Sequence, residues 1–106
     1  MKRYSPVTFE IVGEDGRSRK PRGVVIVRDT EMVLEVECPG DQAYLIRGKD
    51  CGGFYDGFNE GLEGDVPVHA TWSCQGGTYK GTWVEDNEDY TFSFRLPAAS
   101  PRRASN

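Results

Sequence analysis

Helical periodicity is nearly absent from this chain, and this feature limits its possible folds more than any other. Short runs of β-branched and aromatic residues alternate instead with turns rich in Gly, Pro and Asp. This alternation is typical of an antiparallel meander, in which each strand turns directly into the next. We predict a mainly β fold: a single antiparallel meander of about six to eight strands that closes as a small barrel or packs as a sandwich.

The chain has the length of one domain with one modest core. Its 106 residues fall within the range of about 100–150 that a single core commonly organises. Only 37% of them are hydrophobic, and no apolar run reaches the roughly 18–20 residues that a membrane-spanning helix needs. We place the β-rich domain at residues 1–97. Residues 98–106 contain no apolar residue larger than alanine, so a disordered C-terminal tail is predicted there.

The segment 66–96 supports the most detailed structural prediction. We take Gly76-Gly77 as the loop of one hairpin and residues 86–89 as the loop of the next. The first loop places large residues opposite small ones, in the pairs Cys74–Tyr79, Trp72–Gly81 and Ala70–Trp83. The second extends the same apolar face, in the pairs Trp83–Phe92, Gly81–Phe94 and Tyr79–Leu96. Because a slip of one residue would turn this face outward, we expect a three-stranded unit with Trp83 buried.

Shorter strands are predicted nearer the N-terminus, at residues 7–12, 24–28, 32–37 and 43–47. A tight turn at Asp29-Thr30 would place Val25 beside Leu34 and Arg28 beside Glu31. Matching apolar faces and opposite charges both favour that register.

The middle of the chain has two interpretations. The sequence CGGFYDGF at 51–58 echoes CQGGTYKGTW at 74–83, which favours a second glycine-turned hairpin. Phe54, Phe58 and Leu62 instead recur at helical spacing, which gives an α+β alternative with one short helix near 54–62. Gly57 and Gly61 would each weaken that helix by about 0.5–1 kcal/mol. We therefore predict an extended or looped segment.

Charge is segregated along the chain. Residues 1–28 hold seven basic and three acidic residues, whereas residues 29–94 hold three basic and fourteen acidic ones. The candidate interaction residues are the basic loop Arg17, Arg19, Lys20 and Arg22, which can contact an acidic protein or phosphate. A solvated hairpin loop is the alternative. The acidic body and the absence of interleaved aromatic residues make nucleic acid an unfavourable partner.

The three cysteines, Cys38, Cys51 and Cys74, are an odd number without a CxxC pair. Together with the lack of an apolar secretory segment at the N-terminus, they predict free thiols in the cytoplasm. Cys74 is expected to be buried beside Trp72. A zinc site with His69 as a fourth ligand is disfavoured, because His69 and Cys74 would point to opposite faces of one strand.

The common catalytic motifs are absent. The chain has no phosphate-binding glycine loop, no GxSxG, no HExxH and no EF-hand ladder, and His69 is its single histidine. Acidic residues gather at 50–65 and 85–89 and could bind a hard cation, but the spacing at 56–61 lacks the alternating oxygen ligands of a calcium loop, and acidic loop tips also serve solubility. We therefore expect no catalytic residue, no metal and no cofactor.

These observations favour a non-enzymatic domain with a protein-interaction or accessory role. One alternative is a small-ligand-binding β-barrel that uses an aromatic face, formed by Trp72, Trp83, Tyr79, Tyr90, Phe92 and Phe94. A domain this small needs those side chains for its own core, which disfavours that use. A metal-dependent or His69-based enzyme is the least favoured interpretation.

Overall fold

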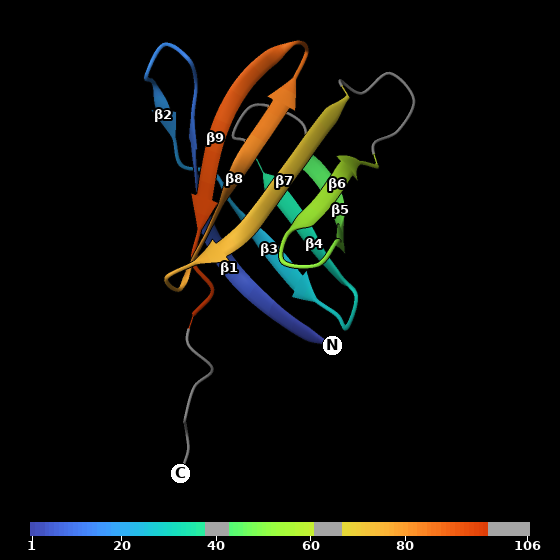
Figure 1. The fold of residues 1–106 in the computed structure, drawn as a ribbon. Coiled ribbons are helices and arrows are strands. Elements are labelled where there is room, and N and C mark those ends of the chain that lie inside the picture. The colour runs from blue at the N-terminus through green and yellow to red at the C-terminus, as the bar shows by residue number, and fades with distance from the viewer. Residues whose placement is uncertain (38–42, 61–66, 98–106) are drawn as a thin grey trace.

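The protein forms a closed antiparallel β-barrel in a computed structural model that describes residues 1–37, 43–60 and 67–97 (Figure 1). Within these ranges the chain forms nine strands: β1 (Lys2–Val12), β2 (Ser18–Arg19), β3 (Arg22–Val27), β4 (Glu31–Glu37), β5 (Ala43–Asp50), β6 (Tyr55–Asn59), β7 (Val68–Gln75), β8 (Thr78–Glu85) and β9 (Glu88–Phe94). β3 to β9 pair in chain order, and β1 pairs with both β3 and β9. Eight strands therefore close the barrel, and the short β2 adds to the edge of β1.

The predicted β meander is confirmed, and it closes as a barrel. The helix considered near 54–62 is wrong, because residues 55–59 form β6 and no helix occurs in the described residues. The segment is extended because it pairs with both β5 and β7, and Gly57 permits the close approach to β5: a Cβ atom there would lie 2.6 Å from the carbonyl oxygen of Arg47. Phe54 and Phe58 are exposed rather than on a shared buried face, and Leu62 lies outside the described residues.

Alternate residues of the strands point inward and fill the barrel. The side chains of Trp72 and Trp83 are 1% and 2% exposed. Glycines make room for them: a Cβ atom on Gly48 would overlap the indole of Trp72. The rest of the core consists of smaller aromatic and aliphatic residues from the other strands, including Phe9, Met32, Leu34, Ile46, Phe92 and Phe94.

The first predicted hairpin register is confirmed. Trp72 pairs with Gly81 and Ala70 with Trp83 around the Gly76-Gly77 turn. In the N-terminal half, Val25 pairs with Leu34, and Arg28 forms an ion pair of 2.8 Å with Glu31, also as predicted.

The second hairpin register is wrong by two residues. Trp83 pairs with Tyr90 and Gly81 with Phe92, because the loop is the two-residue turn Asp86-Asn87 rather than residues 86–89. Both turn residues have positive φ, 53° and 63°, a conformation that Asp and Asn tolerate better than most residues. A shift of two residues keeps every side chain on its face, so the apolar surface survives the error.

The expected burial of Cys74 is also wrong. Cys74 is exposed, because β7 continues past the core toward the end of the barrel. Cys51 is likewise free and exposed, and Cys38 lies outside the described residues, as does the predicted tail 98–106. Among the residues described, we find no helix long and apolar enough to cross a membrane.

Candidate functional site

The barrel is imperfectly closed where β1 meets β9. The N-terminal part of β1, from Lys2 to Thr8, pairs with β3, whereas pairing with β9 runs from Phe9 to Val12. The register with β3 shifts between Tyr4 and Val7, next to a cis Ser5–Pro6 bond. Figure 1 shows the first part of β1, in dark blue, running away from the end of β9. Because β9 ends at Phe94, the partner of Phe9, it is the chain after β9 that diverges from β1 at this end of the barrel.

A groove of about 860 Å³ occupies the divergence, and we call it the seam groove. It is bordered by two stretches of consecutive residues, 6–8 on β1 and 93–97 at and beyond the end of β9. Its remaining lining comes from the neighbouring loops and strands: Glu10, Lys20, Gly77 and Thr78. The groove thus lies between the edge of β1 and the end of β9.

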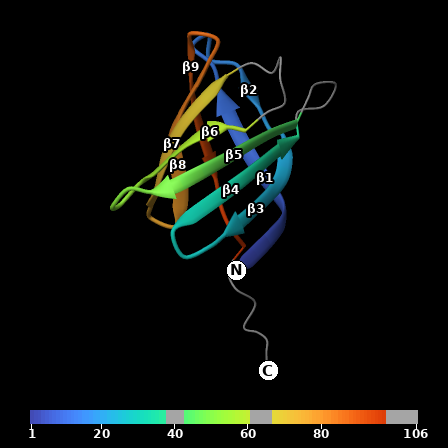
Figure 2. The same cartoon turned by 90° about the vertical axis from the view of Figure 1, so that its right-hand side faces the viewer.

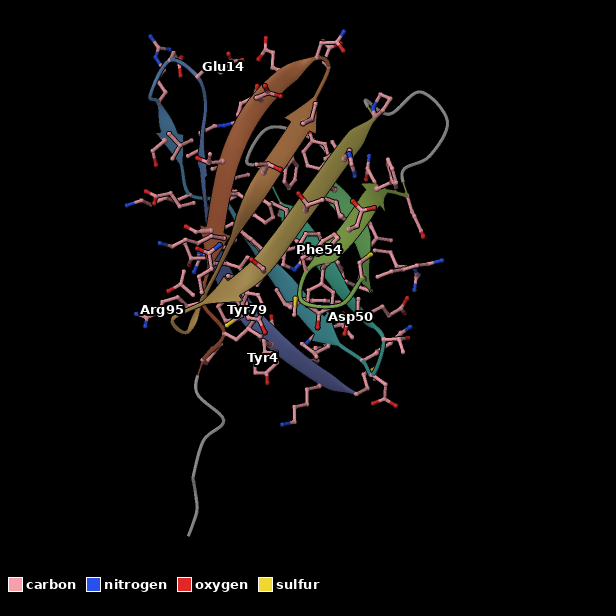
Figure 3. The ribbon with its side chains drawn as sticks, viewed as in Figure 1. Tyr4, Glu14, Asp50, Phe54, Tyr79 and Arg95 are labelled. Carbon is pink, nitrogen blue, oxygen red and sulfur yellow. The ribbon has the colours of Figure 1, made fainter. Side chains whose placement is uncertain are left out.

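Basic side chains from opposite ends of the sequence meet at this groove. Lys20 follows β2, and Arg95, labelled in Figure 3, follows β9; both are exposed and border the groove. The one acidic lining residue, Glu10, accepts a hydrogen bond of 3.0 Å from the Ser18 hydroxyl. Lys80 is a near neighbour, since it pairs with Ser93 of the groove lining. Barrel closure therefore converts the charge segregation of the sequence into a basic surface.

The structure separates the four predicted interaction residues. All four are exposed, but only Lys20 borders the seam groove. Arg17 and Arg19 border a second hollow beside Tyr90, where Arg17 lies 3.6 Å from Asp15. Arg22 belongs to β3 and pairs in register with Glu37.

Two cations of this surface, Lys80 and Arg95, were not among the predicted residues. The excess of basic residues near both ends of the sequence was the available signal. That excess of charge identifies Lys80 and Arg95 as members of one surface only when β1 and β9 are known to pair.

β3, β4 and β5 lie side by side in one wall of the barrel (Figure 2), and the middle strand of this wall is acidic. β4 carries Glu31, Glu35 and Glu37 and no basic residue. Arg47 on β5 is paired twice, at 2.9 Å to Glu60 and 3.0 Å to Glu31. The hydrogen bond and charge of Glu60, with the charge of Glu31, raise the pKa of Arg47 above its ordinary value. Arg47 is thus neutralised by carboxylates of the protein itself.

The interior aromatic residues are committed to the core. The indole N–H of Trp72 donates to the Met32 sulfur at 3.2 Å. Glu85 accepts hydrogen bonds from the Trp83 indole at 2.9 Å and the Tyr44 hydroxyl at 2.7 Å. Neither tryptophan borders any of the surface hollows described for this structure. The two tryptophans of the aromatic face therefore serve packing, whereas Phe94 also borders the seam groove.

His69 lies on the outer surface, where its Nε2 is 2.6 Å from Asp56 Oδ1. The exposed ring of Phe58 stacks on its imidazole, with centroids 4.4 Å apart and planes at 9°. The hydroxyl of Thr71, on the same face of β7, contacts Thr82 at 2.9 Å instead. Within the described residues, no group of three His, Cys, Asp or Glu side chains is placed to hold a metal ion.

Comparison with known proteins identifies a similar fold and no more specific relationship. No protein-family model matches the chain, and no curated protein matches its sequence. Among solved structures, a redesigned β-barrel superposes with a TM-score of 0.58, covering 87% of this chain and 89% of that one. At 13% sequence identity, this similarity shows that the chain has a β-barrel fold and says nothing about its activity.

Proposed function

We propose that this protein is a non-enzymatic interaction domain that binds an acidic segment of another protein at the seam groove. The carrying observation is the pair of cations at the groove, Lys20 and Arg95, in a chain of net charge −4. Neither forms an ion pair with another described residue. Both are therefore available to carboxylates of a partner.

The contrast with the remaining surface supports this assignment. Arg28 and Arg47 are held by glutamates of the protein itself. Cations that are already paired offer little to a partner, whereas exposed unpaired cations attract an acidic surface and accelerate its encounter. The packed interior also supports an external binding surface over a ligand site inside the barrel.

The test measures binding of a fluorescent, capped peptide of alternating glutamate and valine, about eight residues long, by fluorescence anisotropy. We expect Lys20→Glu and Arg95→Glu each to weaken binding by about tenfold or more. Lys49→Glu is the matched control, because it makes the same charge change on β5, away from the groove. Raising salt from about 25 mM to about 300 mM should weaken binding to the parent protein, since exposed charges are screened.

Two results would contradict this function. An equal loss in Lys49→Glu would show that overall charge, and not the seam groove, controls binding. Tighter binding of a DNA duplex of matched charge would make nucleic acid the partner, in place of an acidic protein segment.

A further inference from the structure

The lining of the seam groove suggests how a partner would bind there. Successive residues of a strand point to opposite faces of a sheet. A hollow on one face is therefore bordered by alternate residues, whereas this groove is bordered by the consecutive stretches 6–8 and 93–97. Its borders are thus the backbone edge of β1 on one side and, on the other, the end of β9 with the three residues that follow it.

The edge of β1 is open. From Lys2 to Thr8, β1 pairs with β3, and its described register with β9 begins only at Phe9. A strand paired on one side presents backbone N–H and C=O groups on the other, and such an edge can accept an added strand. The open edge of β1 and the seam groove are continuous, because residues 6–8 belong to both.

Pro6 limits what this edge can do alone. It lacks a backbone N–H, so the edge cannot form a complete ladder with an incoming strand. Edge prolines of this kind discourage unspecific strand pairing. Binding of a strand here therefore needs further contacts from side chains. The charged side chains around the edge can supply them.

The charges along the edge select an acidic strand. Lys2 and Arg3, both exposed, lie at its start, and Lys20 and Arg95 lie at the groove. A second copy paired through β1 would bring two such basic clusters together. The segment that follows Pro97 carries Arg102 and Arg103, so like charges also disfavour this chain's own C-terminal residues as the occupant.

We propose that an acidic, extended segment of a partner protein adds as a β-strand to the open edge of β1, from Lys2 to Thr8, with its carboxylates near Arg3, Lys20 and Arg95. This inference rests on the proposed function and specifies the form of the partner. Backbone pairing would supply the alignment, and the ionic contacts would supply the selectivity.

The experiment compares the glutamate–valine peptide with two analogues that carry N-methyl groups on alternate residues, one set on the glutamates and the other on the valines. Each analogue keeps every side chain and loses the N–H groups of one edge only. We expect one analogue to bind at least about tenfold more weakly and the other to bind like the parent peptide. Equal binding of the parent and both analogues, or an equal loss for both, would overturn strand addition while leaving the proposed function intact.

A protein variant tests the length of the binding edge. Arg3 lies on β1 outside the seam groove. We expect Arg3→Glu to weaken binding of the parent peptide by about threefold or more, and Lys49→Glu to leave that affinity unchanged. An unchanged affinity in Arg3→Glu would confine binding to the groove and overturn pairing along β1. Failure of the parent peptide to bind the unaltered protein would instead reject the proposed function itself, and this inference with it.

Hydrogen exchange gives a second readout. Bound peptide should slow exchange in the segment 2–8 and leave β4 unaffected, because only the edge of β1 gains a strand. Peptide binding without that protection would show that side chains alone make the contact.

Discussion

The barrel interior and the seam groove use the same strands, but the interior is closely packed and the seam groove is open to solvent. Inside, Trp72 and Trp83 are almost fully buried, and Gly48 on β5 leaves room for the indole of Trp72. At the seam groove, β1 continues beyond the end of β9, and the lining includes two exposed cations, Lys20 and Arg95. The interior therefore stabilises the fold, and the seam groove is the surface at which we propose that a partner binds. Substitutions should separate these two roles.

The largest effect is expected from Trp83→Ala. Removing this indole leaves a cavity in the core and takes one hydrogen-bond donor from Glu85, so we expect a loss of about 3–5 kcal/mol in unfolding free energy. Denaturant unfolding measures this loss. Phe58→Ala is the control, since the ring of Phe58 is 60% exposed and its removal should cost far less. Equal losses would show that the interior is not the source of stability.

A smaller loss of about 1–3 kcal/mol is expected for Gly81→Ala. The added methyl group would overlap the carbonyl oxygen of Thr71 on the paired strand, which forces β7 and β8 apart. Lys80→Ala, at the next position but pointing outward, should change the midpoint of thermal unfolding very little. A fully stable Gly81→Ala protein would contradict the close approach of these two strands.

Charge removal at the basic loop should affect binding and spare folding. Replacing Arg17, Arg19, Lys20 and Arg22 by alanine is expected to change unfolding free energy by no more than about 0.5 kcal/mol per substitution, because all four are exposed. Of the four single variants, Lys20→Ala should weaken binding of the acidic peptide. Arg17→Ala should leave binding unchanged, since only Lys20 borders the groove. Peptide titrations of the two single variants measure the difference, and equal effects would move the site to the second hollow.

The smallest effect concerns Tyr90, beside the second hollow. Its hydroxyl donates a hydrogen bond of 2.7 Å to Glu88, and this bond, with partial burial and the Glu88 charge, raises the pKa of Tyr90 to about 12. Tyrosinate absorbance, taken as the difference between the parent protein and Tyr90→Phe, measures that pKa. In Glu88→Gln the pKa should fall toward the ordinary value of 10.0.

The sign of the accompanying stability change follows from the raised pKa. The folded protein holds the Tyr90 proton more tightly than the unfolded chain does. The stabilisation is therefore complete below about pH 10 and is lost as pH rises from about 10 to about 12. If the unfolding free energy rose from about pH 10 to about pH 12 in the parent protein and not in Tyr90→Phe, the result would contradict the hydrogen bond to Glu88.

The sequence predicts the interior better than the seam, for physical reasons. Alternation along β7 and β8 identifies the inward residues, and Gly76-Gly77 sets their register. The next register was missed because Asp86-Asn87 makes a two-residue turn without glycine. Alternation also assigned Cys74 to the apolar face, but it carries no information about where the core ends.

The seam depends on contacts between distant parts of the chain. The first residues of β1 are polar, basic or proline, so no apolar pattern identified them as a strand. The basic loop was found from its local charge density. Its division between two hollows, and the approach of Arg95 to Lys20, follow from the pairing of β1 with β9, which no local pattern encodes.

That same pairing has a consequence for how the barrel assembles. From β3 to β9, each strand pairs with the next along the chain, so these pairs close short loops. The contact of Phe9 with Phe94 instead joins the two ends of the meander. Closing so long a loop carries the largest entropic cost and slows folding, as in other β proteins dominated by distant contacts. We expect the hairpins to form first and the seam to close last, so that the folding rate is most sensitive to residues on either side of this final joint.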